Sequence, residues 1–305
     1  MSLEKYVREL LKKLYLLFLR KVKFSIILNY HRIGETNSKN PFHRLHTINL
    51  SVFKAQVRFC KLIGTFTTLD NITNGRLNSK LNFSITFDDV SFSAINTFKW
   101  LEENKIPFAI CPCKSITLNG LGWRDKVYFI IKYVPYNEIH KKLSSVFDKK
   151  LLCDNYNFYA FSKKDEYHSY NMIEKVVNPL FKTIPEEKLK ELSEKNYISK
   201  SDLLGLKQQF PNLTIVNHSD SHANLNSLSK HEIKREVEEC QTFLSTELSV
   251  QSKYFAVPFG NYSSILGYDL SEISRENNLK AILWVSNTLN LDGGTKPNKI
   301  KHLSP

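Results

Sequence analysis

Three short polar clusters each follow an apolar stretch of the sequence that is typical of a β-strand. The clusters are Asp88-Asp89, His218 to His222 and Pro258-Phe259-Gly260. Adjacent carboxylates on an extended backbone point in different directions, so one could bind a metal ion while the other acts as a base. Two histidines four residues apart could converge on the same ion, and one carboxylate with two histidines leaves coordination positions for water and substrate. A Pro-Phe-Gly turn could present a backbone N–H to a developing oxyanion.

Each cluster also has an ordinary interpretation when it is taken singly. Asp-Asp pairs are usually solvated turn residues, and two histidines at this spacing often occur by chance. All three clusters occur at the ends of apolar strands, and the C-terminal ends of parallel barrel strands meet at one rim. The combination therefore favours a common site.

The elements that would position these clusters alternate between strands and helices. We expect strands at residues 24–30, 83–87, 108–113, 213–216, 254–257, 280–285 and 299–302. We expect helices at 51–62 with Ser51 as N-cap, at 93–104, and at 230–248, which Ser229 and Glu232 open as a capping box. The alternation predicts parallel βαβ units in an α/β fold, and the number of strands favours a barrel.

Residues 115–207 interrupt this alternation of strands and helices. The stretch is rich in Lys, Tyr and Asn, and it shows helical patterns at 123–133 and 186–195. We interpret it as a long, mostly helical insertion, which could be a lid over the barrel mouth or an oligomer contact.

The composition is that of a globular protein. The chain has 305 residues, of which 42% are hydrophobic, so intrinsic disorder is excluded. It has five cysteines, an odd number, and we expect no signal peptide, so we expect reduced thiols. Cys111-Pro-Cys113 lacks the second cysteine pair that a zinc knuckle would need, so we expect both residues to pack in the core.

The formal net charge of +13 suggests an anionic partner, either a membrane or a nucleic acid. Residues 1–25 carry seven Lys or Arg against two Glu, and the apolar residues of 3–18 repeat at helical spacing, which predicts a basic amphipathic helix at 1–23. This helix could lie on an anionic leaflet or pack on its own domain. The apolar run at 14–19 is too short to span a bilayer and has no cleavage site, so we expect a cytoplasmic protein, peripheral at the inner membrane face. Motifs for RNA or DNA are absent, and nucleic acid ranks low as a partner.

Taken together, the motifs resemble those of the polysaccharide deacetylases, the NodB-homology domain of carbohydrate esterase family 4. Residues 86–89 (TFDD) match the first family motif apart from its final glycine, and residues 218–222 match the second. Residues 258–260 match the end of the third motif. The resemblance runs from about residue 24 to the end, outside most of the insertion, and two further segments share it: 29–33 (NYHRI) and 122–126 (GWRDK).

The resemblance implies a distorted (β/α) barrel of seven or eight parallel strands, which would form one domain over residues 24–305. It also implies a divalent metal ion, usually Zn²⁺, and hydrolysis of the amide of an N-acetylated sugar. Asp88 would be the general base, and the metal ligands would be Asp89, His218 and His222. A bound metal lowers the pKa of its water toward neutrality, and a carboxylate can take the proton as that water attacks.

Residues beside these motifs receive supporting roles from the same resemblance. The backbone N–H of Phe259, next to Pro258, would stabilise the oxyanion, and Ser219 would brace the histidine loop. Asp220 and Asn217 flank the histidines, and we expect them to support the ligands without binding the ion.

The sequence departs from the family pattern at several positions. The glycine after the Asp pair is replaced by Val90, so we expect that loop to take a different path. The arginine that usually orients the base is absent from the third motif, where residues 255–257 read FAV. His302 could be the general acid of the last motif or a replacement for an arginine common near the end. His31 is the second candidate for the acid, or a histidine bonded to backbone.

These observations predict a metal-dependent deacetylase of an amino sugar in a surface polysaccharide or glycolipid precursor. A lipid-linked or nucleotide-linked saccharide would suit the basic N-terminus. Two alternatives stay open at this point. One is a deformylase or deacetylase of a lipid-linked aminosugar or small amine, and the other is an inactive carbohydrate-binding domain, which Val90 and the missing arginine motivate.

Overall fold

The computed structural model of the chain describes residues 23–34, 44, 46–147, 158–162, 170–193, 195–261, 270–285, 290–291 and 299–303. For residues 191–193, 261, 290–291 and 299–303 it describes the backbone alone. The amphipathic helix predicted at 1–23 lies outside the described residues except for Lys23, and the boundary between it and one domain at 24–305 stays a prediction. No helix in the described ranges is both long enough and apolar enough to cross a bilayer.

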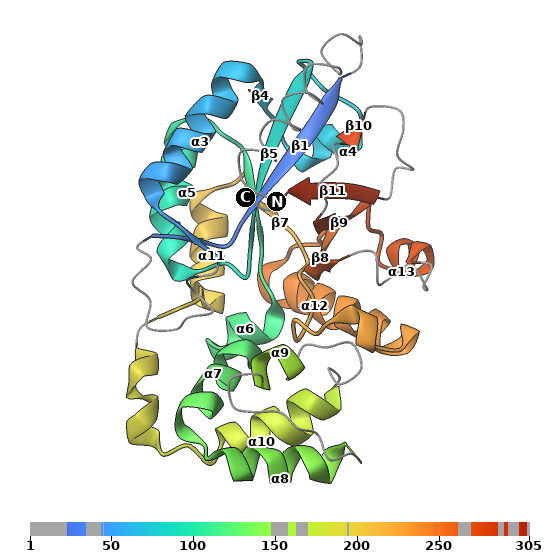
Figure 1. Cartoon of the computed structure of the whole chain (residues 1–305). Coiled ribbons are helices and arrows are strands. Elements are labelled where there is room, and N and C mark those ends of the chain that lie inside the picture. The colour runs from blue at the N-terminus through green and yellow to red at the C-terminus, as the bar shows by residue number, and fades with distance from the viewer. Residues whose placement is uncertain are drawn as a thin grey trace, which may run out of the picture.

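A mostly parallel sheet forms the centre of the structure (Figure 1). Its strands follow the order β7-β6-β5-β1-β11-β9-β8, and all six neighbouring pairs on this path are parallel. The bounds are β1 Phe24–Tyr30, β5 Leu81–Asp88, β6 Phe108–Cys111, β7 Thr214–Ile215, β8 Tyr254–Asn261, β9 Ala281–Val285 and β11 Lys299–Leu303. Two short strands join the same sheet, β4 Thr65–Phe66 and β10 Asn290–Leu291, and a separate pair is formed by β2 Arg32–Ile33 and β3 Thr47–Ile48. The predicted α/β fold with parallel strands is thus confirmed.

The two ends of the strand order face one another. Side chains of β1, β6, β8 and β9 pack in a single buried cluster, which includes Ile27, Ala109, Ala256 and Leu283. A parallel bridge joins Asn217, just after β7, to Phe255 in β8. These contacts are those that a curved, barrel-like sheet requires, while the closed barrel of seven or eight strands stays a prediction.

The strands are apolar because they are buried on both faces, as parallel strands usually are. All eight residues of β5 are buried, the apolar Leu81, Phe83, Ile85 and Phe87 as well as the polar residues that alternate with them. A second core lies outside the sheet, where Phe53, Phe98, Leu203 and Leu244 from four helices pack against Ile85 and other strand residues.

The covering helices are α3 Leu50–Ile63, α4 Leu69–Thr73, α5 Ile95–Glu103, α11 Lys200–Gln209, α12 Lys230–Leu248 and α13 Ser271–Glu276, with short turns η1 Phe92–Ala94 and η5 Leu225–Ser227. The capping box of Ser229 and Glu232 is confirmed at the start of α12. The prediction of Ser51 as an N-cap was wrong. Asn49 caps α3, and its side chain accepts a hydrogen bond from the backbone N–H of Ser51.

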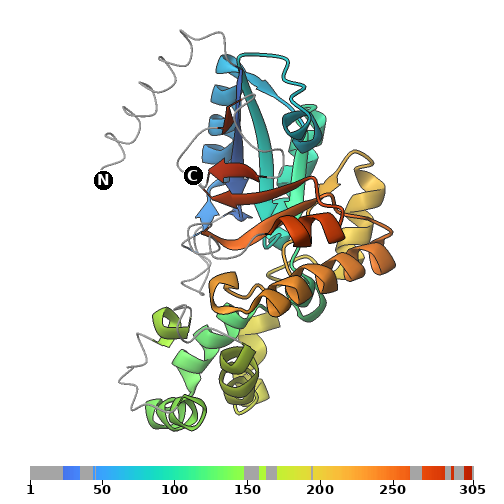
Figure 2. The same cartoon turned by 90° about the vertical axis from the view of Figure 1, so that its right-hand side faces the viewer.

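The stretch 115–207 is largely helical where it is described, as expected. Its elements are α6 Lys114–Asn119, α7 Trp123–Tyr133, α8 Tyr136–Val146, α9 Phe158–Ser162, η3 Asn171–Val177, α10 Asn178–Phe181 and η4 Glu186–Ser193, and it ends in α11. The helices α7 to α10 gather at one end of the sheet, with α12 between them and the strands (Figures 1 and 2). Four cysteines, Cys60, Cys111, Cys113 and Cys240, are free thiols in the core, and Cys153 lies outside the described residues.

Candidate active site

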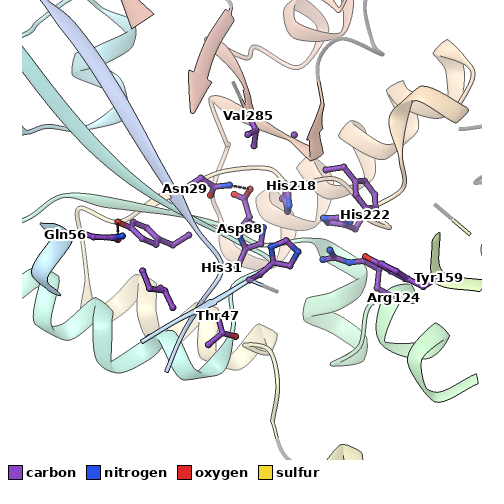
Figure 3. A pocket seen from close by; sticks show the side chains of 15 residues that line it. Asn29, His31, Thr47, Gln56, Asp88, Arg124, Tyr159, His218, His222 and Val285 are labelled. Carbon is purple, nitrogen blue, oxygen red and sulfur yellow. Dashed lines mark hydrogen bonds between the residues drawn. The ribbon is translucent and has the colours of Figure 1, made fainter. Parts of the chain in front are cut away.

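The strand ends bring the three polar clusters to one cavity of about 610 Å³ (Figure 3). Asp88 is the last residue of β5, the histidine loop follows β7, and Phe259 lies in β8. The segment after β1 adds His31 to the same wall. The parallel strand order therefore assembles residues that lie almost 230 positions apart in the sequence.

Three buried side chains could hold a metal ion, namely Asp89, His218 and His222, whose ligand atoms all lie within 4.8 Å of one another. Oδ1 of Asp89 is 3.3 Å from Nε2 of His222 and 3.7 Å from Nε2 of His218. Two ligands bound tetrahedrally to Zn²⁺ at about 2.0–2.1 Å would be about 3.3 Å apart. The spacing therefore fits one shared ion.

The hydrogen bonds of these side chains support the same interpretation. Oδ1 of Asp89 and Nε2 of His218 are buried and make no hydrogen bond within the described part of the chain. Buried polar atoms rarely lack a partner, so an ion between them would resolve the deficit. The Ala256 carbonyl accepts a hydrogen bond from Nδ1 of His218 at 2.9 Å, which places the proton on Nδ1 and leaves the Nε2 lone pair for a metal.

The surroundings of Asp89 and His222 shift the pKa values of both side chains toward the forms that bind a cation. Burial alone would raise the pKa of Asp89, but His222, Arg124 and His218 together hold it well below its usual value. Burial lowers the pKa of His222 to about 3. The carboxylate is thus charged and the imidazole neutral near pH 7, which are the forms that bind a metal.

Several residues of the site have left-handed backbone conformations, which side-chain-bearing residues seldom adopt. Positive φ angles occur at Asp89 (52°), Ser219 (69°), His222 (57°) and Phe259 (60°). Such conformations cost about 1–3 kcal/mol each and persist where the surroundings hold them. Their concentration here shows that tertiary contacts, rather than local preference, shape the loops.

Arg124 of α7 contacts the opposite side of Asp89. One guanidinium nitrogen, Nη2, donates to Oδ2 of Asp89 at 2.5 Å, and the guanidinium lies 5.7 Å from the ring centre of Phe259. The bond uses one carboxylate oxygen and leaves Oδ1 directed at the histidines. The insertion thus contributes a charged group to the site.

Asn29 in β1 holds the other carboxylate. Its Nδ2 donates to Oδ2 of Asp88 at 2.8 Å (Figure 3). Its Oδ1 accepts from the hydroxyl of Thr86 at 3.1 Å. A carboxylate can only accept a hydrogen bond, so the Nδ2 group of Asn29 must face Asp88, and its Oδ1 faces the hydroxyl of Thr86. Sequence reasoning missed Asn29 and the pairing of Arg124, because neither residue carries a motif signal for its partner.

The turn at 258–260 presents Phe259 to the cavity. The residues between Ala256 and Asn261 leave the register that pairs β8 with β9, and Gly260 has a φ of 65°. A Cβ atom at Gly260 would lie only 2.2 Å from Cγ2 of Val285. Glycine is therefore required here, both for its conformation and for the close approach of β9. Pro258 precedes this turn within β8.

The two candidates for the general acid are placed differently. His31 is half-buried on the cavity wall, and its ring stacks on His46 at 4.8 Å between centres. Loss of solvent lowers the pKa of His31, against the opposing charge of Asp88. His302 pairs through its backbone with Ile27 and Val285 in β11, and its side chain lies outside the described atoms.

The residues that flank the histidines take up distinct positions. The Asn217 amide oxygen accepts from the backbone N–H of Ser219 at 3.0 Å, and the hydroxyl of Ser219 accepts from the backbone N–H of His222 at 3.0 Å. Asp220 turns away from the ligands, and its side chain lies 3.4 Å from the ammonium of Lys114. Asn217 and Ser219 therefore stiffen the loop from inside, while the Asp220 side chain pairs at its outer edge.

Comparison with known proteins agrees with this arrangement. A family model described as polysaccharide deacetylase matches residues 193–282, which include the histidine loop and the Pro-Phe-Gly turn. No curated protein matches the sequence of this chain significantly.

Solved structures of deacetylases share the fold of this chain at low identity. The deacetylase PplD of Streptococcus pyogenes, in complex with acetate, has a TM-score of 0.57 at 14% identity, with 93% of each chain covered. IcaB from Ammonifex degensii has a TM-score of 0.55 at 14% identity, with 93% of this chain and 92% of that chain covered. A de-N-acetylase from Aggregatibacter actinomycetemcomitans has a TM-score of 0.53 at 13% identity, covering 92% and 94%.

The residue after the Asp pair is buried in the core. Val90 packs in the core beside Phe87 and Ile198, and its carbonyl accepts from the backbone N–H of Ile198 at 3.1 Å. The left-handed residue of the turn is Asp89, and Val90 is not among the residues with positive φ. A β-branched side chain is therefore tolerated at position 90.

Proposed function

We propose that this protein is a metal-dependent hydrolase that removes an N-acetyl group from an amino sugar of a surface polysaccharide or glycolipid precursor. The observation that carries the proposal is that Asp88, His218 and His222 line one cavity, while Asp89 groups with the two histidines as a possible metal-ligand set. A base beside a three-ligand metal set is what amide hydrolysis by activated water requires. The match of residues 193–282 to the polysaccharide deacetylase model supports the reaction class.

Asp89, His218 and His222 would hold the ion, for which Zn²⁺ is the best candidate by ligand type. When bound, the ion would supply Lewis acidity and lower the pKa of water. Asp88 takes the proton from the water whose oxygen attacks the acetamide carbon. Asn29 keeps that carboxylate in place through the bond to Oδ2.

The developing oxyanion and the leaving amine would be served by other residues that line the cavity. The backbone N–H of Phe259 stabilises the negative charge that develops on the amide oxygen. When the C–N bond breaks, the leaving amine takes a proton and acetate is released. His31 is the better-supported donor, because it lines the same cavity as Asp88, whereas His302 is supported by its place in β11 alone.

We further propose that the substrate is linked to a lipid or a nucleotide, and that residues 1–23 bring the enzyme to an anionic membrane face. The basic amphipathic pattern of that segment supports this placement. A deformylase would use the same residues, since the cavity holds the same base and ligand set for either acyl group.

The test is acetate release from N-acetylated sugar oligomers, with and without a chelator. We expect activity that is lost on metal removal, restored by Zn²⁺, and reduced by about 100-fold or more in Asp88→Asn. Formate release from N-formylated sugars separates a deformylase from a deacetylase. Activity that survives both full metal removal and Asp88→Asn would refute the mechanism, and zinc binding without turnover would favour a binding domain.

A further inference from the structure

The loop that carries His218 and His222 cannot hold its shape by itself. Two of its residues, Ser219 and His222, have left-handed backbone conformations. These conformations are disfavoured for residues with a Cβ atom and need support from neighbouring structure. Part of that support comes from α6, whose first amides at Lys114 and Ser115 donate to the carbonyls of Ser219 and Asp220 at 3.2 and 2.8 Å.

A second support comes from Glu236, a buried carboxylate with no part in the proposed reaction. It lies in the second turn of α12, and its side chain accepts from the backbone N–H of Ser221 at 2.9 Å and from the hydroxyl of Ser221 at 2.6 Å. Its own carbonyl accepts from the backbone N–H of Asp220 at 3.0 Å. A single residue thus fixes two of the three positions between the metal-binding histidines, Asp220 and Ser221.

The insertion contacts Glu236 through Tyr170 and the loop itself through Trp123. The hydroxyl of Tyr170 donates to Oε1 of Glu236 at 2.7 Å, and the guanidinium of Arg235 lies over the Tyr170 ring at 5.1 Å. The indole N–H of Trp123 donates to the carbonyl of His222 at 3.0 Å. Because α12 lies between the sheet and the insertion, Glu236 is placed to join the two (Figure 2).

We propose that the helical insertion is a brace for the metal-binding loop, in which Glu236 is the positioning residue and Tyr170 ties the insertion to it. This proposal rests on the metal site of the proposed function. It differs from a lid, because a lid that moves during turnover would have to break buried bonds to Glu236 and to the His222 carbonyl. The brace acts on affinity for the metal, since the loop must hold both imidazoles toward one point.

The test compares Zn²⁺ affinity in four variants by competition with a chromophoric chelator. Glu236→Met removes both side-chain acceptors at similar size and keeps the backbone carbonyl, and we expect Zn²⁺ binding to weaken by about 10–100-fold, as for other groups that orient ligands. Glu236→Gln should recover most of the affinity, because the hydroxyls of Ser221 and Tyr170 can rotate to accept from the amide. Tyr170→Phe should weaken binding several-fold, and Tyr136→Phe, an exposed tyrosine of the same insertion, should change nothing.

Acetate release at saturating Zn²⁺ should return toward the wild-type rate in each variant. An unchanged zinc dissociation constant in Tyr170→Phe would overturn the tie to the insertion. Equal weakening in Glu236→Gln and Glu236→Met would overturn the positioning role. If Glu236→Met does not fold, Tyr170→Phe decides alone, since it removes one hydroxyl. A wild-type protein that binds no Zn²⁺ would instead refute the proposed metal site.

Discussion

The amide of Asn29 donates to Oδ2 of Asp88 across the boundary between β1 and β5, and the hydroxyl of Thr86 holds that amide in the donating direction. Both Asn29 and Asp88 are buried, so solvent cannot replace the bond. A neutral side chain thereby orients the proposed base, whereas the family that the motifs resemble usually has an arginine for this task.

We predict that Asn29→Leu lowers kcat for deacetylation by up to about 100-fold, because a small displacement of a catalytic group is costly in rate. KM and the zinc content should stay near the wild-type values. Asn82→Leu is the matched control, since Asn82 is also buried and bonds to the carbonyls of Phe24 and Ser79 instead. It should lower the melting temperature and leave kcat unchanged; an equal loss of kcat in both would contradict the role of Asn29.

The pairing of Arg124 with Asp89 predicts a second effect on metal binding. Arg124→Gln removes the cation that bonds to Oδ2, and we expect the zinc dissociation constant to rise about 10–100-fold. Asp89→Ala should abolish stoichiometric zinc binding, because it removes a ligand. Both are measured by metal analysis and chelator competition. Lys126→Gln, on the same helix but bonded to Asn178, should bind zinc like the wild type.

Gly260 should not tolerate a side chain. Gly260→Ala places a Cβ atom against Val285 and imposes a left-handed conformation on alanine, and we expect a loss of about 2–4 kcal/mol in the free energy of unfolding. Chemical denaturation measures the loss. The double variant with Val285→Ala should recover the steric part and retain about 1 kcal/mol of backbone strain. A Gly260→Ala protein as stable as the wild type would contradict this prediction, because β9 would then have to move away from residue 260 without loss of stability.

The pH dependence of stability should reveal the contact of α4 with β8 and with the residue preceding β9. Lys280 donates to Oδ1 of Asp70 at 2.8 Å and the hydroxyl of Tyr254 donates to the same atom at 2.6 Å, and these bonds lower the pKa of Asp70. Because the pKa of this acid is lower in the folded state, the stabilisation is complete above the unfolded pKa of about 3.9 and is lost as pH falls through the folded value.

Asp70→Asn should therefore reduce the free energy of unfolding by about 0.5–1 kcal/mol near pH 7, a modest amount because the side chain is half exposed. The difference from wild type should stay constant down to about pH 5 and shrink below pH 4. Lys280→Gln should show the same trend. A difference that grows as the pH falls would contradict the assignment.

The strands and the longest helix could be predicted from the sequence because their signals are local. Short segments rich in apolar residues mark β1 and β5, and a Ser-x-x-Glu box marks the start of α12. The helix start at Asn49 was missed because asparagine and serine are both common caps, and the choice depends on which backbone N–H needs an acceptor.

The sequence was sufficient to identify the reactive groups, namely an Asp pair, two histidines at fixed spacing and a Pro-Phe-Gly turn on parallel strands. Residue type and short spacing suffice for these, because each cluster lies within five residues. The tertiary structure alone decided which groups support the cluster. The partners of Asp88, Asp89 and Ser221 are Asn29, Arg124 and Glu236, at separations of 59, 35 and 15 residues. Such pairings depend on how strands and the insertion pack in space, and no local pattern records them.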